Sequence, residues 1–135
     1  MQMLHAVNTV ILTLIFLISG CSVKVHIDEM WGRYKLKYPY GSEELLLNKD
    51  GTYVQTVFIN GEATPKVNTG KWEFDENHSR VILVNAMIVD DYFGHLRPSY
   101  WEIKPGLSIF RVKKSFGRIK LIINPDQGFF FEKII

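Results

Sequence analysis

The chain has 135 residues, of which 47% are hydrophobic and 22% are charged, so it is long enough for one domain and too apolar to be disordered. Its 16 Lys and Arg against 14 Asp and Glu give a net charge of +2, which falls short of the dense basic face of nucleic-acid-binding domains, and no nucleic-acid partner is expected. The single cysteine excludes an intramolecular disulfide, and no Cys/His set is present for a structural zinc site.

The N-terminal segment has the features of an export signal. A largely apolar run covers residues 10–18, and the first charged residue of the chain is Lys24. A membrane-spanning helix needs about twenty apolar residues, so this run has instead the length of a signal-peptide core. The small residues Ser19 and Gly20 follow it, as a signal-peptidase site requires. Residues 1–20 are therefore predicted to be a signal peptide.

The sequence around the only cysteine resembles the lipobox of bacterial lipoproteins. Ile18, Ser19, Gly20 and Cys21 match its usual form, which is Leu, a small residue, Gly or Ala, and then Cys. The resemblance implies that the Cys21 thiol receives diacylglycerol, that the chain is cut before it, and that the new amino group is acylated with a fatty acid such as palmitate. Two alternatives stay open: an uncleaved signal anchor, and a soluble N-terminal helix with Cys21 as a buried thiol.

A lipid anchor also predicts where the protein resides. Two or three acyl chains on one cysteine hold a protein on a bilayer effectively permanently, whereas one chain gives marginal attachment. Residues 21–31 are then the lipidated N-terminus and its tether, and the membrane is a partner through Cys21. Ser22 stands where lipoproteins kept in the inner membrane tend to have Asp. The resemblance thus implies the bacterial cell envelope and, in a diderm host, the periplasmic face of the outer membrane.

From residue 32 onward the hydrophobic residues recur with period two, which favours half-buried strands. Turn signals rich in Gly, Pro, Asn and Asp separate the runs, as in all-β barrels and sandwiches. The segment 23–27 is a further candidate strand, and residues 85–98 fit an irregular strand, a short helix or a long loop. About eight or nine strands are predicted, over residues 33–38, 45–47, 52–59, 71–74, 80–84, 101–103, 107–112, 118–123 and 129–133.

These strands predict a single all-β domain over residues 32–135, an antiparallel up-and-down barrel or a sandwich. Closure into a barrel removes exposed sheet edges. A barrel of about eight strands is either filled by side chains or holds one small ligand, and the aromatic content does not choose between the two. The residues expected to face inward are Tyr34, Leu36, Tyr38, Leu45, Leu47, Trp72, Phe74, Leu83, Trp101, Ile103, Ile119, Leu121 and Ile123.

Several of the turns and aromatic residues resemble those of lipocalin-like domains in small bacterial lipoproteins. Gly32 and Tyr34 are similar to the Gly-x-Trp start of lipocalins, and Asp50, Gly51 and Tyr53 form a similar hairpin pattern. The same resemblance extends to Gly70-x-Trp72 and to the Asp126-x-Gly128 turn. It implies a lipocalin-like fold and nothing about function, because such folds host unrelated activities. No ligand-site residue is carried over, and the usual lipocalin disulfide is absent.

Candidate catalytic groups are sparse. Asp90, Asp91 and His95 form the only acid–imidazole cluster, which fits a divalent cation or an acid–base pair, but its spacing matches no established metal motif. A solvated loop explains it more simply. There is no Gly-x-Ser-x-Gly motif, and spacing selects no pair among the glutamates at positions 43, 44, 62, 102 and 132. No catalytic residue, metal or cofactor is therefore predicted.

Two other segments are candidates for binding. The stretch 111–120 is the strongest concentration of positive charge, suited to lipid headgroups or an acidic partner, although cations at a hairpin tip also serve solubility. Aromatic pairs bracket the uncertain loop at residues 92–93 and 100–101, either as an exposed patch or as a plug of a barrel end. The predicted binding residues are Tyr92, Phe93, Arg97, Tyr100, Arg111, Lys113 and Lys114.

The leading hypothesis from the sequence is a non-catalytic, lipid-anchored envelope domain. It would bind a partner protein through loops at one barrel end, with residues 85–101 and 111–120 as the contact surfaces. One alternative is a carrier of a small apolar ligand in a barrel cavity. Others are an inhibitor or immunity protein of the envelope, and an enzyme using Asp90, Asp91 and His95.

Overall fold

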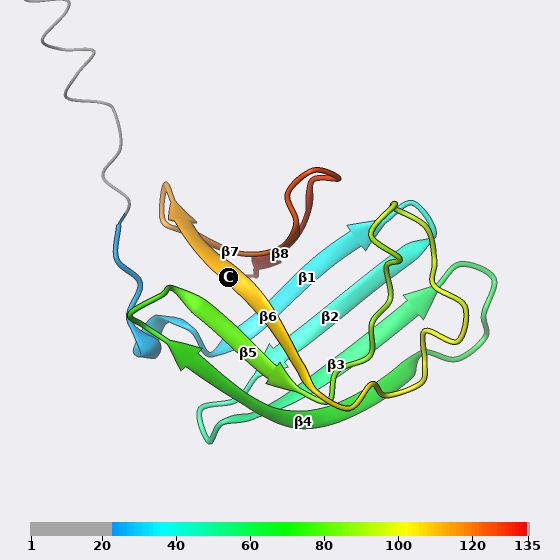
Figure 1. Ribbon diagram of the computed structural model, residues 1–135, viewed down its shortest axis with the longest axis horizontal. Coiled ribbons are helices and arrows are strands. Elements are labelled where there is room, and N and C mark those ends of the chain that lie inside the picture. Colours follow the sequence, from blue (N-terminus) through cyan, green and yellow to red (C-terminus); the bar gives the residue numbers. More distant parts are fainter. Residues whose placement is uncertain (1–22, 135) are drawn as a thin grey trace, which may run out of the picture.

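The computed structural model describes residues 23–134, which form a closed barrel of eight antiparallel strands in sequential order (Figure 1). The predicted all-β, up-and-down architecture is confirmed. A short 3₁₀ turn, η1 (Ile27–Glu29), precedes the barrel in place of the candidate strand at residues 23–27. The strands are β1 (Gly32–Tyr38), β2 (Gly41–Leu47), β3 (Thr52–Ile59), β4 (Lys66–Asp75), β5 (Arg80–Val84), β6 (Leu107–Ser115), β7 (Arg118–Asn124) and β8 (Phe129–Lys133).

Residues 1–20, predicted to be a signal peptide, and Cys21 lie outside the described residues. Within residues 23–134, no helix is long and apolar enough to cross a membrane.

The up-and-down order assigns every connection to one of two barrel ends. The tether end holds the start of β1, the β2–β3, β4–β5 and β6–β7 turns, and the end of β8. The loop end holds the β1–β2, β3–β4 and β7–β8 turns and the long segment 85–106. The chain enters the barrel at the tether end, far from the segment 85–106 along the strands (Figure 1).

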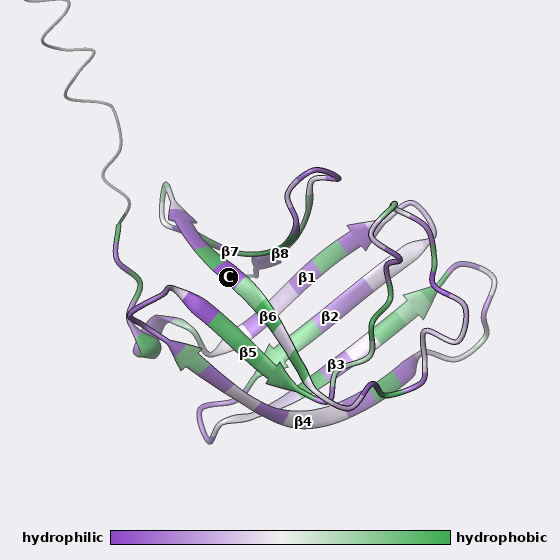
Figure 2. Cartoon of the chain, viewed as in Figure 1, coloured by the Kyte–Doolittle hydropathy of each residue, from purple (hydrophilic) through white to green (hydrophobic). Residues whose placement is uncertain are grey.

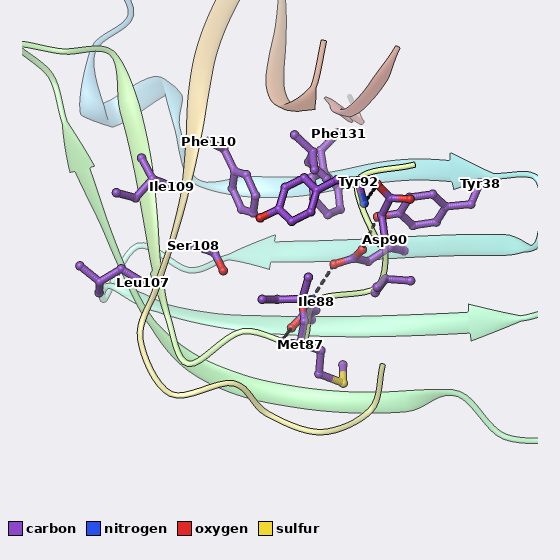
Figure 3. A pocket seen from close by; sticks show the side chains of 14 residues that line it. Tyr38, Met87, Ile88, Asp90, Tyr92, Leu107, Ser108, Ile109, Phe110 and Phe131 are labelled. Carbon is purple, nitrogen blue, oxygen red and sulfur yellow. Dashed lines mark hydrogen bonds between the residues drawn. The ribbon is translucent and has the colours of Figure 1, made fainter. Parts of the chain in front are cut away.

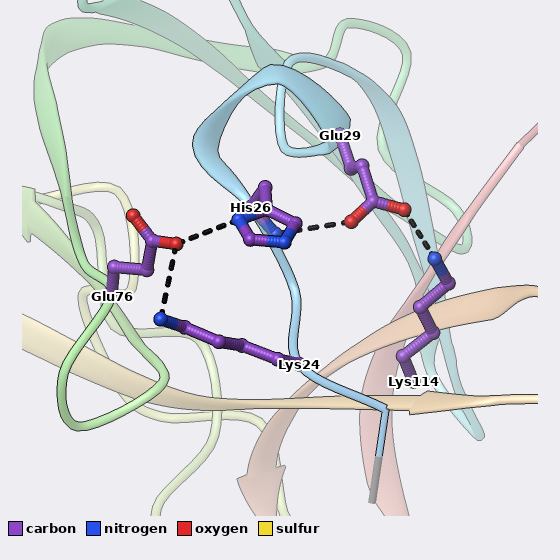
Figure 4. Close-up of polar contacts among 5 residues, drawn as sticks. All are labelled: Lys24, His26, Glu29, Glu76 and Lys114. Atoms are coloured by element: carbon purple, nitrogen blue, oxygen red, sulfur yellow. Dashed lines mark hydrogen bonds and ion pairs between the residues drawn. The ribbon is translucent and has the colours of Figure 1, made fainter.

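Ion pairs hold the residues before β1 against the tether end (Figure 4). His26 Nδ1 lies 2.8 Å from Glu76 Oε1, and Lys24 Nζ lies 3.6 Å from the same oxygen. Glu29 pairs with Lys114 of β6, and this pairing is the main cause of a pKa of Glu29 below its usual value. Exposed pairs contribute little individually, but together they orient the N-terminal segment.

The barrel interior follows from the period-two pattern, since alternate side chains of each strand point inward. Figure 2 shows hydrophilic and hydrophobic residues alternating along β1 and β4, whereas most of β5 is hydrophobic. Two of the buried rings also satisfy backbone groups: Tyr34 donates a hydrogen bond to the carbonyl of Met30 at 2.7 Å, and Trp72 Nε1 donates to that of Asn48 at 2.8 Å. The predicted inward residues that are buried are Tyr34, Leu36, Tyr38, Leu45, Leu47, Trp72, Leu83, Ile119 and Leu121, and Phe74 and Ile123 pack against them.

The prediction that Trp101 and Ile103 belong to the core was wrong. The side chains of Trp101 and Ile103 are 51% and 54% exposed, because residues 85–106 form a long loop and not a strand. Only isolated bridges occur in it, such as Met87 with Ile103. Alternation of apolar residues therefore did not suffice to form a strand at residues 101–103, because no neighbouring strand was available to pair with them.

Some strand ladders stop short of the loop end, whereas those of β1–β2 and β2–β3 reach it. The barrel is closed by a β1–β8 ladder of only two residue pairs, Tyr34 with Lys133 and Lys35 with Glu132. The β6–β7 ladder begins at Ser115 and Arg118 and ends at Arg111 and Ile122, so the first half of β6 pairs only with β5. The strands thus separate where the segment 85–106 enters the barrel.

We predict that Gly41→Ala destabilises the barrel, because a Cβ atom there would lie 2.0 Å from the carbonyl oxygen of Phe58 on β3. Backbone cannot yield as a flexible side chain does, so we expect a loss of at least about 2 kcal/mol in the free energy of unfolding, measured by urea denaturation. Ser42→Ala, at the adjacent position, is the control and should change it by less than about 0.5 kcal/mol. Equal stabilities of the two variants would contradict the close β2–β3 approach.

Candidate functional site

Three polar side chains occupy inward positions in the middle of the barrel. Glu43 on β2, Gln55 on β3 and Asn68 on β4 are 4%, 2% and 5% exposed. Their strands are neighbours, and the same alternation that buries Leu45 and Leu47 buries Glu43. Buried polar groups are costly unless they are hydrogen-bonded, so this cluster requires internal partners.

Gln55 supplies most of those partners. Its Nε2 donates to Glu43 Oε1 at 2.6 Å and to the carbonyl of Met87 at 2.9 Å, while its Oε1 accepts from the amide of Met87 at 2.9 Å. Asn68 Nδ2 donates to the carbonyl of Asn85 at 2.9 Å. Side chains of β3 and β4 thereby replace the strand partner that the start of the segment 85–106 lacks, and they hold this segment inside the barrel.

A pocket of about 230 Å³ lies between this polar cluster and β6 (Figure 3). Most of its lining residues are apolar, and its polar groups come from four strands, β1, β2, β3 and β6, and from the segment 85–106. The lining residues are Tyr38, Glu43, Gln55, Met87, Ile88, Val89, Asp90, Tyr92, Leu107, Ser108, Ile109, Phe110, Ile123 and Phe131.

Glu43 is the acid at the inner side of this pocket. Burial raises its pKa from 4.5 to about 7, and the hydrogen bonds from Gln55 and from the Tyr38 hydroxyl, the latter at 3.1 Å, offset only part of that effect. Burial, and then the neighbouring Glu43, raise the pKa of Tyr38 well above its usual value. The Tyr38 hydroxyl therefore stays protonated and acts as a donor to Glu43.

Asp90 is the second acid in the lining and comes from the loop. Its side chain is 6% exposed; Oδ2 accepts the amide of Tyr92 at 3.1 Å, and the buried Oδ1 has no hydrogen-bond partner. The hydroxyl of Tyr40, whose ring stacks on Tyr38 at 4.9 Å, is also buried without a partner. Burial, followed by the charges of Asp90 and Glu43 and by the contact of the hydroxyl with the Asp90 side chain, raises the pKa of Tyr40.

The predicted aromatic binding residues do not form one patch. Tyr92 and Phe93 are 68% and 76% exposed, and only Tyr92 of the two lines the pocket. Tyr100 is buried and donates to Glu62 Oε2 at 2.6 Å, as a plug of the loop end. Arg97 is half-buried, with its amide bonded to the carbonyl of Val89.

The predicted basic residues lie away from those aromatic residues. Arg111 and Lys113 are exposed on β6, and Lys114 is paired with Glu29 at the tether end. The β6–β7 turn that follows presents the fully exposed Phe116. Residues 85–101 and the tip of the basic hairpin thus occupy opposite ends of the barrel, and they cannot form the single contact surface that the sequence suggested.

Asp90, Asp91 and His95 do not converge either. Asp91 Oδ2 lies 3.3 Å from His95 Nδ1 on the surface, whereas Asp90 is buried in the pocket lining. Among the described residues, no group of three His, Cys, Asp or Glu side chains is placed to hold a metal ion. An acid–base site built from these three residues is therefore not formed.

Of the two pocket acids, sequence reasoning singled out Asp90, in a cluster with Asp91 and His95, but not Glu43. Glu43 was one of five glutamates among which spacing could not choose, and Gln55 carried no motif. A usable signal existed, because both occupy inward positions of otherwise apolar strand faces.

Comparison of the chain with protein-family models, curated proteins and solved structures finds no match. The chemistry of the pocket is therefore inferred from its own residues. Apolar walls with a few converging polar groups are typical of small-molecule sites.

We predict that Glu43 makes stability depend on pH. Between pH 4.5 and about 7 the folded protein retains a proton that the unfolded chain releases, so the free energy of unfolding falls as the pH rises through this window, by up to about 3 kcal/mol. Glu43→Gln keeps the shape of the side chain and should remove this decline in urea denaturation at pH 4.5 to 8.

The matched control is Glu44→Gln. Glu44 is the next residue on β2 but faces outward, where it pairs with Lys35 at 3.1 Å. Glu44→Gln should show the same fall in the free energy of unfolding with rising pH as the parent protein. A Glu43→Gln protein whose stability falls with pH as steeply as that of the parent would contradict the assignment to Glu43.

Proposed function

We propose that the protein is a lipid-anchored lipoprotein of the bacterial cell envelope whose barrel binds a small, largely apolar ligand. The observation that carries the binding role is the pocket, whose lining combines the aromatic rings of Phe110 and Phe131 with a buried acid and a buried amide, Glu43 and Gln55. Its volume of about 230 Å³ exceeds the roughly 150 Å³ of an engineered apolar cavity that binds benzene. A ligand of about ten non-hydrogen atoms is thus of the right size.

The anchor in this proposal is supported by the lipobox-like sequence ending at Cys21. The first described residue, Val23, lies two positions later, and the following residues join the barrel at its tether end. A lipid at Cys21 would therefore direct the tether end toward the bilayer. The pocket, formed with the segment 85–106 of the loop end, would then open away from the membrane surface.

A second candidate function is the binding of an envelope protein, including a toxin or hydrolase that the domain would neutralise. The exposed rings of Tyr92, Phe93 and Trp101 in the segment 85–106 favour it. Phe93 separates the two functions, because it does not line the pocket. Phe93→Ala would weaken binding of a partner protein and leave binding of the small ligand unchanged.

We predict that the full chain, reconstituted in phosphatidylcholine nanodiscs, binds indole in this pocket. Ser108 lines the pocket and pairs across the sheet with the buried Leu83, so Ser108→Phe should fill the space and lower indole affinity at least tenfold in calorimetric titration. Thr69→Phe adds the same ring at an exposed position of β4 and should leave binding unchanged. Circular dichroism checks that the variants fold. Equal indole affinity of the two variants would contradict the pocket as the indole-binding site.

For the anchor, we predict that mass spectrometry of the protein from a bacterial host finds a mature chain beginning at Cys21 with the added mass of diacylglycerol and an N-acyl group. Cys21→Ser lacks the thiol that accepts the lipid and should retain the mass of the full precursor. Ser22→Ala is the control and should be processed like the parent. An unmodified Cys21 in an uncleaved parent chain would refute the anchor.

A further inference from the structure

The pocket contains two buried acids and no basic residue. Glu43 and Asp90 both line it, and both are more than nine-tenths buried. None of the fourteen lining residues is Lys, Arg or His. Buried carboxyl groups are normally paired with a cation or fully hydrogen-bonded, and here no cation is supplied by the pocket itself.

The same two groups have unused capacity to accept hydrogen bonds. A carboxylate offers about four acceptor positions. Glu43 receives one donor on each oxygen, from Gln55 and Tyr38. Asp90 receives the Tyr92 amide on Oδ2, and its Oδ1 has no hydrogen-bond partner, although the unpartnered Tyr40 hydroxyl is close enough to interact with this side chain. An ammonium group has three donors and one positive charge, so it supplies the hydrogen-bond donors and the cation that the pocket lining lacks.

The rest of the lining determines what the ammonium would be attached to. Phe110 and Phe131 lie with ring centroids 6.1 Å apart, and Ile123 and Met87 add apolar surface. A hydrated divalent metal ion does not suit such walls, since Ca²⁺ takes six to eight oxygen ligands. An aromatic or aliphatic body of roughly benzene size does suit them.

We infer that the ligand is a small organic amine, with its ammonium group at Glu43 and Asp90 and its apolar body against Phe110 and Phe131. This inference rests on the proposed binding function and specifies the chemical class of the ligand. It also gives a role to Glu43, an acid at an inward position where the fold would otherwise place an apolar side chain.

The test compares 2-phenylethylamine with 2-phenylethanol, which has the same number of non-hydrogen atoms and no charge. Calorimetric titration uses the full chain in phosphatidylcholine nanodiscs at pH 7.5, with empty nanodiscs as the blank. We expect the amine to bind at least tenfold more tightly than the alcohol. Glu43→Gln and Asp90→Asn should each lower amine affinity at least tenfold, and Glu44→Gln should not. Because Asp90 lies in the loop and not in a strand, Asp90→Asn provides the test if Glu43→Gln does not fold.

The outcomes separate this inference from the proposed function. Equal affinity for amine and alcohol would overturn the amine assignment and leave a ligand-binding pocket in place. Binding of indole without binding of the amine would do the same. Tighter binding of Ca²⁺ than of the amine, lost in both acid variants, would replace the amine with a metal ion. Failure of indole, amine and alcohol alike would overturn the binding function itself.

Discussion

The hydrogen bonds of Gln55 are the contacts on which the loop end of the barrel depends. One side chain joins Glu43 of β2 to both backbone groups of Met87, and so it takes the place of a neighbouring strand for the segment 85–106. A segment that enters an apolar interior must satisfy its amide and carbonyl groups, and it does so here with side chains. The pocket exists because this path leaves space between the loop and β6.

The two ends of the barrel consequently have different properties. At the tether end β6 pairs with β7 and β1 pairs with β8, and ion pairs such as Glu29 with Lys114 hold the N-terminal segment there. The loop end has divergent strands, buried acids and exposed aromatic rings. If the N-terminus is lipidated, the tether end would lie toward the membrane, and the loop end, with its buried acids and exposed aromatic rings, would lie away from it.

Most of the fold was predictable because local signals determined it. Period-two alternation located the strands, and the Asn48–Gly51 turn has the positive φ at Gly51 (83°) that a glycine there suggests. A long loop was one of three possibilities for residues 85–98, and the sequence could not choose it because the conformation depends on hydrogen bonds to Gln55 and Asn68, more than fifteen residues distant. Glu43 was missed for a related reason: an inward glutamate is unusual, and only its spatial neighbours explain it.

The two-pair junction between β1 and β8 has a consequence for how the molecule forms. It joins Tyr34 to Lys133, nearly the full length of the described chain, whereas the other ladders join consecutive strands. The loss of chain entropy on closing so long a loop is compensated by very few backbone bonds. Sequential hairpins would therefore assemble first into a curved, open sheet, and joining its two edges would be the slow final event of folding, and the first to reverse.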